Sequence, residues 1–215
     1  MAGDFDRQMR EIIGRLAREG RKPRLLLHAC CAPCSTSVLE QLAGFFRISV
    51  YYYNPNIDPP EEYRFREKEL KEFLSTFPFP EPVEFREAAY EPARFYEAVR
   101  GLENEPERGS RCTACYRLRL RETAAEAARG GFEYMATTLT LSPQKDPLRL
   151  NRIGREEAEA QGVLWLPSDF KKRNGYLRSV EITRACGMYR QNYCGCRFSH
   201  RTAAETESLR KEIQV

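Results

Sequence analysis

The chain has 215 residues, with 35 Lys and Arg against 31 Asp and Glu and a formal net charge of +4. This length is sufficient for one hydrophobic core, and so small a net charge cannot by itself indicate a nucleic-acid partner. No apolar run approaches membrane-spanning length, and residues 1–10 are too charged for a secretory signal, so we expect a cytoplasmic protein with no membrane partner.

The first 23 residues predict an amphipathic helical extension, because Phe5, Met9, Ile12, Ile13 and Leu16 follow helical spacing. Strands and helices then alternate. The strands are predicted at 24–29, 46–53, 83–86, 132–138 and 163–166. The helices are predicted at 35–42, 59–74, 92–100, 112–129 and 151–161.

This alternation predicts an α/β fold with a mostly parallel sheet covered by helices on both faces. One domain is expected over 24–200, followed by a tail or helix at 201–215. Ligands of such sheets bind beyond the carboxyl ends of the strands. Three segments fall there, namely Cys30–Cys34, Tyr53–Asn56 and Thr137–Pro143.

Eight cysteines are the strongest chemical signal of the chain. A reducing cytosol disfavours structural disulfides, so the thiols indicate metal binding or redox catalysis. Seven of them form three close groups: Cys30, Cys31 and Cys34; Cys112 and Cys115; Cys194 and Cys196. The isolated Cys186 is interpreted as a buried structural thiol.

Two of the three groups lie at predicted helix starts, where the positive end of the helix dipole favours thiolates. Cys34 stands near the beginning of one helix, and Cys112 and Cys115 bracket the first turn of another. Sets of four thiolates suit both zinc and iron–sulfur clusters, and spacing does not decide between the metals. Structural zinc is the less favoured of the two, because the pairs lack ribbon-like, glycine-rich knuckles.

Five motifs, in the same order, resemble the epoxyqueuosine reductases of the QueH type over about Arg24 to His200. They are His28–Cys34, Tyr52–Ile57, Arg111–Arg117, Thr137–Pro143 and Tyr189–Cys196. The resemblance implies a fold akin to the adenine-nucleotide α-hydrolase (HUP-like) proteins, with a cysteine-rich metal site at the carboxyl rim of the sheet. The 24–200 segment would then be an iron–sulfur reductase domain.

The resemblance also implies the final step of tRNA queuosine biosynthesis, in which the epoxide of epoxyqueuosine at the wobble position is reduced to queuosine. A [4Fe–4S] cluster held by Cys30, Cys31, Cys112 and Cys115 would serve this reaction. Cys194 and Cys196 would form a redox-active pair, cycling as dithiol and disulfide, or would ligate an additional iron. Cys34 departs from the acidic residue of the family pattern and is a candidate ligand of that second iron. The implied partners are tRNA containing epoxyqueuosine and an electron donor.

Reduction of an epoxide to an alkene needs two electrons and protonation of the departing oxygen, whereas such a cluster passes one electron at a time, so a second electron store or a second iron is expected. The candidate proton donors by residue type are Tyr53, Tyr193 and Lys145. The stretch Gly101–Ser110 is interpreted as a mobile loop that could gate the site. Both histidines, His28 and His200, are interpreted as structural or exposed.

Basic and aromatic residues near the cysteines are candidates for tRNA binding, although solvated helix faces and core packing explain many of them equally well. The basic ones are Arg111, Arg117, Arg119, Arg121, Lys171, Lys172, Arg173, Arg184, Arg190, Arg197 and Arg201. The aromatic ones are Tyr116, Tyr176, Tyr189, Tyr193 and Phe198.

Two other functions remain open. The chain could be a zinc-stabilised RNA-binding module without catalysis, which would be colourless when purified. An ATP-dependent tRNA-modifying enzyme would need a glycine- and serine-rich phosphate loop after the first strand, where this chain has Cys30–Cys34 instead.

Overall fold

A computed structural model describes residues 4–199. It confirms an α/β fold whose helices and strands alternate along most of the chain. The helices are α1 (Phe5–Arg18), α2 (Ala32–Leu42), α3 (Pro60–Thr76), α4 (Pro92–Ala98), α5 (Ser110–Arg129), α6 (Pro147–Glu159) and α7 (Gly175–Ala185), with a 3-10 turn η1 (Thr138–Leu141). The strands are β1 (Arg24–His28), β2 (Arg47–Tyr52), β3 (Glu84–Glu87), β4 (Tyr134–Thr137) and β5 (Leu164–Trp165).

The five strands form one sheet in the order β3-β2-β1-β4-β5, and every pairing is parallel. The chain starts at the central strand β1, adds β2 and β3 on one side, and then crosses back to add β4 and β5 on the other. The connections therefore reverse direction between β1 and β4, which is where ligands bind in folds of this class. This architecture is consistent with the HUP-like fold that the sequence resemblance implies.

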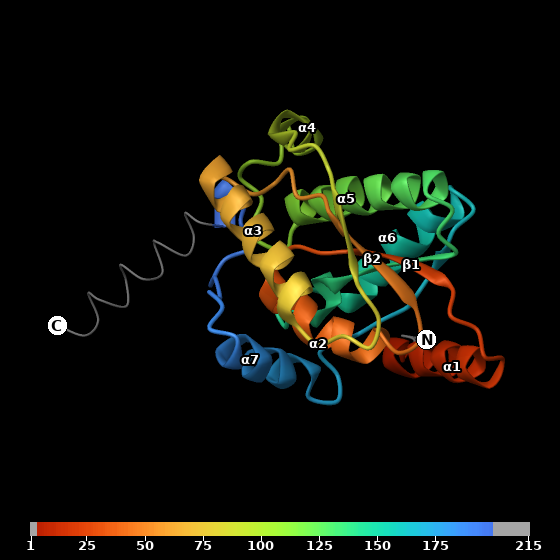
Figure 1. Ribbon diagram of the computed structural model, residues 1–215. Coiled ribbons are helices and arrows are strands. Elements are labelled where there is room, and N and C mark those ends of the chain that lie inside the picture. The colour runs from red at the N-terminus through yellow and green to blue at the C-terminus, as the bar shows by residue number, and fades with distance from the viewer. Residues whose placement is uncertain (1–3, 200–215) are drawn as a thin grey trace.

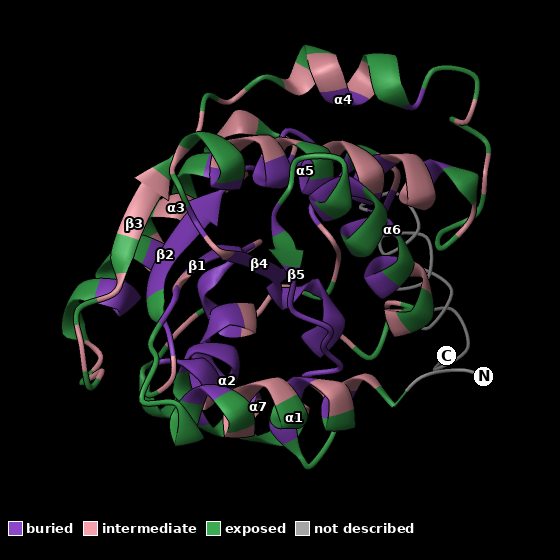
Figure 2. Cartoon of the chain, turned by 90° about the vertical axis from the view of Figure 1, so that its right-hand side faces the viewer, coloured by how far each residue is buried: buried purple, intermediate pink, exposed green. Residues whose placement is uncertain are grey.

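Helices cover both faces of the sheet (Figures 1 and 2). One core contains residues of α1, α2, α3 and α7 together with alternate strand residues such as Leu25 and Leu27. The other contains residues of α5 and α6 packed on Leu26 and Met135. Strand side chains alternate between the two faces, so burial on both sides explains why β1 is a continuous apolar run. The short α4 lies outside α5.

Two helices begin three or four residues earlier than the sequence predicts, and one helix is additional. Helix α2 begins at Ala32 rather than residue 35, because Pro33 is well suited to a first helical turn. Helix α6 begins at Pro147 rather than residue 151, and the Asp146 side chain caps it by accepting a hydrogen bond from Leu148 N. Helix α7 was not predicted.

The N-terminal prediction is confirmed as a helix, α1. Asp4 caps it through a hydrogen bond from Arg7 N, and Met9 and Leu16 are buried against the sheet. The predicted tail or helix at 201–215 lies outside the described residues. Within residues 4–199, no helix is both long enough and apolar enough to cross a membrane.

Gly154 on α6 permits close packing against β5. A Cβ at this position would lie 2.4 Å from Cη2 of the Trp165 ring. The indole cannot move freely, because it is buried and donates from Nε1 to Asn151 Oδ1 at 3.0 Å. We therefore expect Gly154→Ala to lower the free energy of unfolding by about 1–3 kcal/mol in chemical denaturation.

Gly44→Ala is the matched control for this prediction, because a Cβ there meets no atom within 4 Å. Its effect should be neutral or slightly stabilising, up to about 1 kcal/mol. Equal stability of the two variants would show that α6 and β5 do not pack as closely as described.

Candidate cysteine site at the carboxyl edge of the sheet

The carboxyl ends of β1, β2 and β4 bring the predicted site segments together. His28, the last residue of β1, is paired with Tyr51 on β2 and with Thr137 on β4. The segments that follow these strands therefore meet at one edge. Cys30 Sγ lies 3.8 Å from Thr138 Oγ1, so the first cysteine group sits at the reversal point between β1 and β4.

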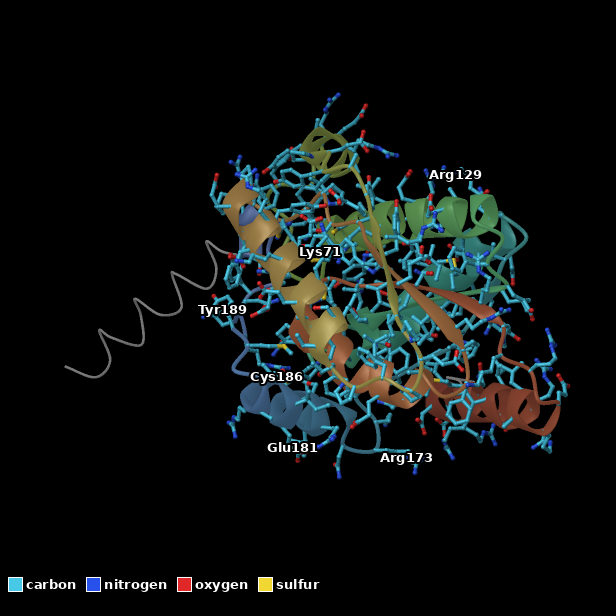
Figure 3. All side chains as sticks on the ribbon, in the orientation of Figure 1. Lys71, Arg129, Arg173, Glu181, Cys186 and Tyr189 are labelled. Atoms are coloured by element: carbon cyan, nitrogen blue, oxygen red, sulfur yellow. The ribbon has the colours of Figure 1, made fainter. Side chains whose placement is uncertain are left out.

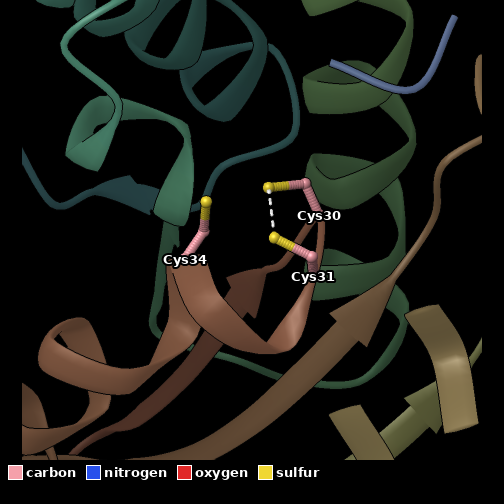
Figure 4. Close-up of side chains that lie close together, drawn as sticks. All are labelled: Cys30, Cys31 and Cys34. Atoms are coloured by element: carbon pink, nitrogen blue, oxygen red, sulfur yellow. Dashed lines mark hydrogen bonds between the residues drawn. The ribbon is translucent and has the colours of Figure 1, made fainter. Parts of the chain in front are cut away.

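The first cysteine group is a compact set of three thiols. The Sγ atoms of Cys30, Cys31 and Cys34 all lie within 4.8 Å of one another, and those of Cys30 and Cys31 are 3.7 Å apart (Figure 4). Cys31 is the N-cap residue of α2 and Cys34 lies in its first turn, as predicted. The chain therefore delivers three soft ligands to one point, close enough to share a metal.

The three thiols differ in acidity. Hydrogen bonds from Cys31 and Cys34 hold the pKa of Cys30 well below its usual range. Donating to Cys30 in turn raises the pKa of Cys31 to about 12 and raises that of Cys34. Cys30 is therefore the most acidic of the three thiols, and its two neighbours are the weaker acids. A bound metal ion would displace the thiol protons.

The other two cysteine groups meet in one pocket. Cys112 and Cys115 from α5 line it together with Cys194 and Cys196 from the C-terminal segment. The Sγ atoms of Cys194 and Cys196 are 3.4 Å apart, and a hydrogen bond from Cys196 lowers the pKa of Cys194. Phe95 of α4 is buried against the same pocket. The structure thus groups the four thiols of the two later motifs in one pocket.

Contacts to the 54–66 region hold the Cys194–Cys196 segment in place. Asp58 N donates to Gly195 O at 2.9 Å, and the buried Arg66 donates from Nη1 to Cys194 O at 3.4 Å. Arg66 itself is paired with Glu62 at 2.7 Å. Gly195 has a φ of +107°, a conformation that disfavours side chains, and a Cβ there would lie 3.1 Å from Arg66 Nη1.

Two cations connect the cysteine groups. Burial acts to lower the pKa of Arg119, but the thiols of Cys115 and Cys30 outweigh it and raise that pKa overall. Burial likewise disfavours the ammonium of Lys145, yet Tyr116, Cys194 and Cys30 together raise its pKa. Both side chains also line the pocket. A positively charged setting favours thiolate ligands.

The basic residues predicted to contact RNA divide into buried and exposed ones. Arg111 and Arg119 are buried, so neither belongs to a solvated helix face. Arg117 and Arg121 are partly to largely exposed and pair with Glu157. Arg201, like His200, lies outside the described residues. The segment Gly101–Ser110, interpreted as a mobile loop, is held by Arg111, which donates to the carbonyl oxygens of Leu102, Glu103 and Glu105.

The aromatic candidates for base stacking are mostly engaged in packing. Tyr116 is buried, and Tyr176 and Phe198 lie beneath the guanidinium groups of Arg190 and Arg111. Tyr193 lies beneath Arg66. Tyr189 is the exposed candidate, with its ring against Phe65.

The remaining predictions have mixed outcomes. Of the three candidate proton donors, Lys145 lines the pocket, whereas the Tyr53 ring stacks on Tyr51 on the α5 side of the sheet. His28 is structural, with Nδ1 2.8 Å from Thr137 Oγ1. The interpretation of Cys186 as a buried thiol is wrong, because it is exposed at the end of α7 (Figure 3).

Sequence reasoning missed Arg66, Asn54 and Asn56 as individual site residues. Asn54 Nδ2 donates to Ala29 O at 2.9 Å, which ties the segment after β2 to the segment after β1. Asn56 is buried and lines the pocket, and its Oδ1 has no hydrogen-bond partner among the described residues. For Asn54 and Asn56, the position just after β2 was the available signal, whereas Arg66 lies within α3.

Thiol alkylation of the metal-free protein tests the acidity order. Because the pKa of Cys30 is lowered, its rate with iodoacetamide should rise less steeply between about pH 6 and about pH 8 than the rate of a free thiol, which rises about tenfold per pH unit. Cys31 and Cys34 should react at least about tenfold more slowly at neutral pH. Peptide mass spectrometry measures each site, with N-acetylcysteine as the reference thiol. A Cys30 rate that rises as steeply as the reference would refute the order.

Comparisons with known proteins show which family this chain resembles. The family model described as "Epoxyqueuosine reductase QueH" matches residues 25–202. A protein of that name from Staphylococcus epidermidis is 42% identical over 99% of this chain and 91% of its own length. One from Streptococcus pyogenes is 44% identical over 90% of this chain and 76% of its own length. One from Thermotoga maritima is 35% identical over 81% of this chain and 89% of its own length.

Among solved structures, the Bordetella bronchiseptica enzyme WbmH in complex with NAD+ aligns over 67% of this chain and 55% of the WbmH chain. Its TM-score is 0.33 at 11% sequence identity, which is too low to support an argument. The family match covers most of the chain and all three cysteine groups. The chain belongs to the QueH family of epoxyqueuosine reductases.

Proposed function

We propose that this protein is an iron–sulfur oxidoreductase of the cytoplasm that reduces the epoxide of epoxyqueuosine in tRNA, giving queuosine. The observation that carries the proposal is the grouping of seven thiols into two sets: three that lie within 4.8 Å of one another, and four that line one pocket together with Arg119 and Lys145. They come from three distant segments that have no other evident reason to meet. Relatives of 35–44% identity bear the name epoxyqueuosine reductase.

The donor set fits a thiolate-bound iron–sulfur cluster. Such clusters are held by cysteine thiolates, and two of the ligands that we assign below, Cys30 and Cys31, have their Sγ atoms 3.7 Å apart. The site also carries the cations Arg119 and Lys145, which offset the negative charge of several thiolates in a buried place. The residues present therefore suit the cofactor.

Our ligand assignment for the cluster is Cys30, Cys31, Cys112 and Cys115. Cys194 and Cys196 then act as a redox pair, for which their Sγ separation of 3.4 Å is suitable, or with Cys34 as ligands of an additional iron. The grouping of Cys112 and Cys115 with Cys194 and Cys196 in one pocket favours a competing set of four ligands. Serine variants distinguish the two assignments, as argued below.

When bound, the cluster supplies electrons for the reduction one at a time. The chain's own residues have other tasks. Lys145 Nζ is the group we assign to protonate the departing epoxide oxygen, because it lines the pocket and carries no carboxylate partner among the described residues. Phe95, buried beside the thiols, helps to exclude water from the pocket.

Metal analysis tests the cofactor directly. Protein purified without oxygen is expected to be coloured and to contain iron and acid-labile sulfide. Zinc without labile sulfide would contradict the proposal and favour the zinc-stabilised RNA-binding module. In that case RNA binding should persist after Cys194→Ser, because no redox chemistry would be required of this thiol.

A further inference from the structure

Arg119 has an unusual setting for a charged residue. It lies on α5 one turn after Cys115, and its side chain is 3% exposed. Its Nη2 donates to Asn54 Oδ1 at 2.6 Å, and its Nε lies 3.3 Å from His28 Nε2. The guanidinium group is therefore fixed at the carboxyl edge of the sheet, between the segments that follow β1 and β2.

Neither of these partners carries a carboxylate. Asn54 is a neutral amide whose Nδ2 donates to Ala29 O, which directs its Oδ1 toward Arg119. His28 presents the Nε2 of its imidazole to Arg119, while its Nδ1 lies 2.8 Å from Thr137 Oγ1. The hydrogen bonds of Arg119 thus fix its position without neutralising its charge.

No carboxylate pairs with Arg119 among residues 4–199, in contrast to the other arginines near the site. Arg66, equally buried, is paired with Glu62, and Arg117 on the same helix is paired with Glu156 and Glu157. The negative groups that act most strongly on Arg119 are the thiols of Cys115 and Cys30. A buried cation is costly unless an opposite charge is present, so its natural counter-charge is the metal-binding thiolates themselves.

We propose that Arg119 is a positioning residue whose fixed charge raises the reduction potential of the metal centre, and that Asn54 holds it there. This inference rests on the proposed function. One-electron reduction of the centre adds one negative charge, and a fixed cation in a buried site stabilises that charge more than the oxidised state. The Tyr53–Asn56 motif after β2 thereby acquires a role in the electron transfer step.

The test is the midpoint potential of the holoprotein, titrated with dithionite in the absence of tRNA and read by electron paramagnetic resonance. Arg119→Gln should make reduction at least about tenfold less favourable, which is a shift of about 59 mV to more negative potential for one electron. Arg119→Lys keeps the charge and should stay within about threefold of the wild type. Arg121→Gln removes an exposed charge two residues along and should change the potential by less than about twofold.

Asn54→Asp provides a second variant of nearly unchanged shape. Its carboxylate would pair with Arg119 and cancel the charge without deleting the side chain, so the potential should fall as in Arg119→Gln. If Arg119→Gln loses the cluster, the potential of Asn54→Asp decides the inference, because that variant keeps the Arg119 side chain. Loss of the cluster from Arg119→Lys as well would overturn it in favour of a role in shape alone.

The outcomes also separate this inference from the proposed function. A wild-type protein without iron and labile sulfide would overturn the proposed function. A wild-type protein with a cluster whose potential is unchanged in Arg119→Gln and Asn54→Asp would overturn the inference and leave the function standing.

Discussion

Cys30→Ser and Cys112→Ser are each expected to lower the iron and labile sulfide content of the protein about tenfold or more. The visible absorbance of the cluster should fall with them. Serine keeps the size of the side chain but replaces a soft thiolate with a hard, poorly ionised hydroxyl group. Cys30 is the most acidic member of the three-thiol set, and Cys112 of α5 lines the pocket. Turnover should be lost with the cluster.

Cys194→Ser should keep most of the iron and sulfide and lose turnover, because this thiol is assigned to the redox pair. Cys186→Ser is the matched control, since Cys186 is exposed and outside the three groups, and it should keep both cluster and turnover. Equal loss of iron from Cys30→Ser, Cys112→Ser and Cys194→Ser would refute our division of the thiols. Loss from the Cys112 and Cys194 variants alone would identify the four-thiol pocket as the cluster site.

Arg66→Gln is expected to lower the free energy of unfolding by about 3 kcal/mol, because it breaks a buried ion pair with Glu62. This value is at the lower end of the range for such pairs, since Glu62 keeps some contact with solvent. The guanidinium is 1% exposed and also holds the C-terminal cysteine segment through Cys194 O. The substitution should therefore loosen Cys194 as well as destabilise α3. Chemical denaturation measures the first effect, and alkylation of Cys194 in the metal-free protein measures the second.

Arg64→Gln is the control on the same helix. Arg64 is exposed and pairs with the exposed Glu61, so its loss should cost at most about 0.5 kcal/mol and leave Cys194 unchanged. If the two variants are equally stable, Arg66 is not the anchor that its contacts indicate.

The alternation of strands and helices was predictable because β1, β2 and β4 are apolar runs that are buried on both faces. Helix α7 was not predictable in the same way. Arg173 and Asn174 before it adopt positive φ angles, no side chain caps its start, and Val180, Ile182 and Thr183 are typical of strands. Packing against α2 stabilises it, and that partner is far away in sequence.

The location of the site was predictable, but the grouping of its residues was not. Motifs after strands of a parallel sheet must meet at one edge, which indicated Cys30–Cys34 and the segment after β2. Sequence spacing cannot reveal that Cys194 and Cys196 share a pocket with Cys112 and Cys115. Arg119 lies among many charged residues of α5. Its burial and its contacts with Asn54 and His28 distinguish it from them, and these are seen only in the structure.

The most direct test of the central claim is nucleoside mass spectrometry of tRNA that contains epoxyqueuosine, after incubation without oxygen with the iron- and sulfide-containing protein and a chemical reductant. We predict conversion of epoxyqueuosine to queuosine that requires both the protein and the reductant. Unchanged epoxyqueuosine, in the presence of protein shown to contain reducible iron and sulfide, would contradict the assignment of this chain as an iron–sulfur epoxyqueuosine reductase.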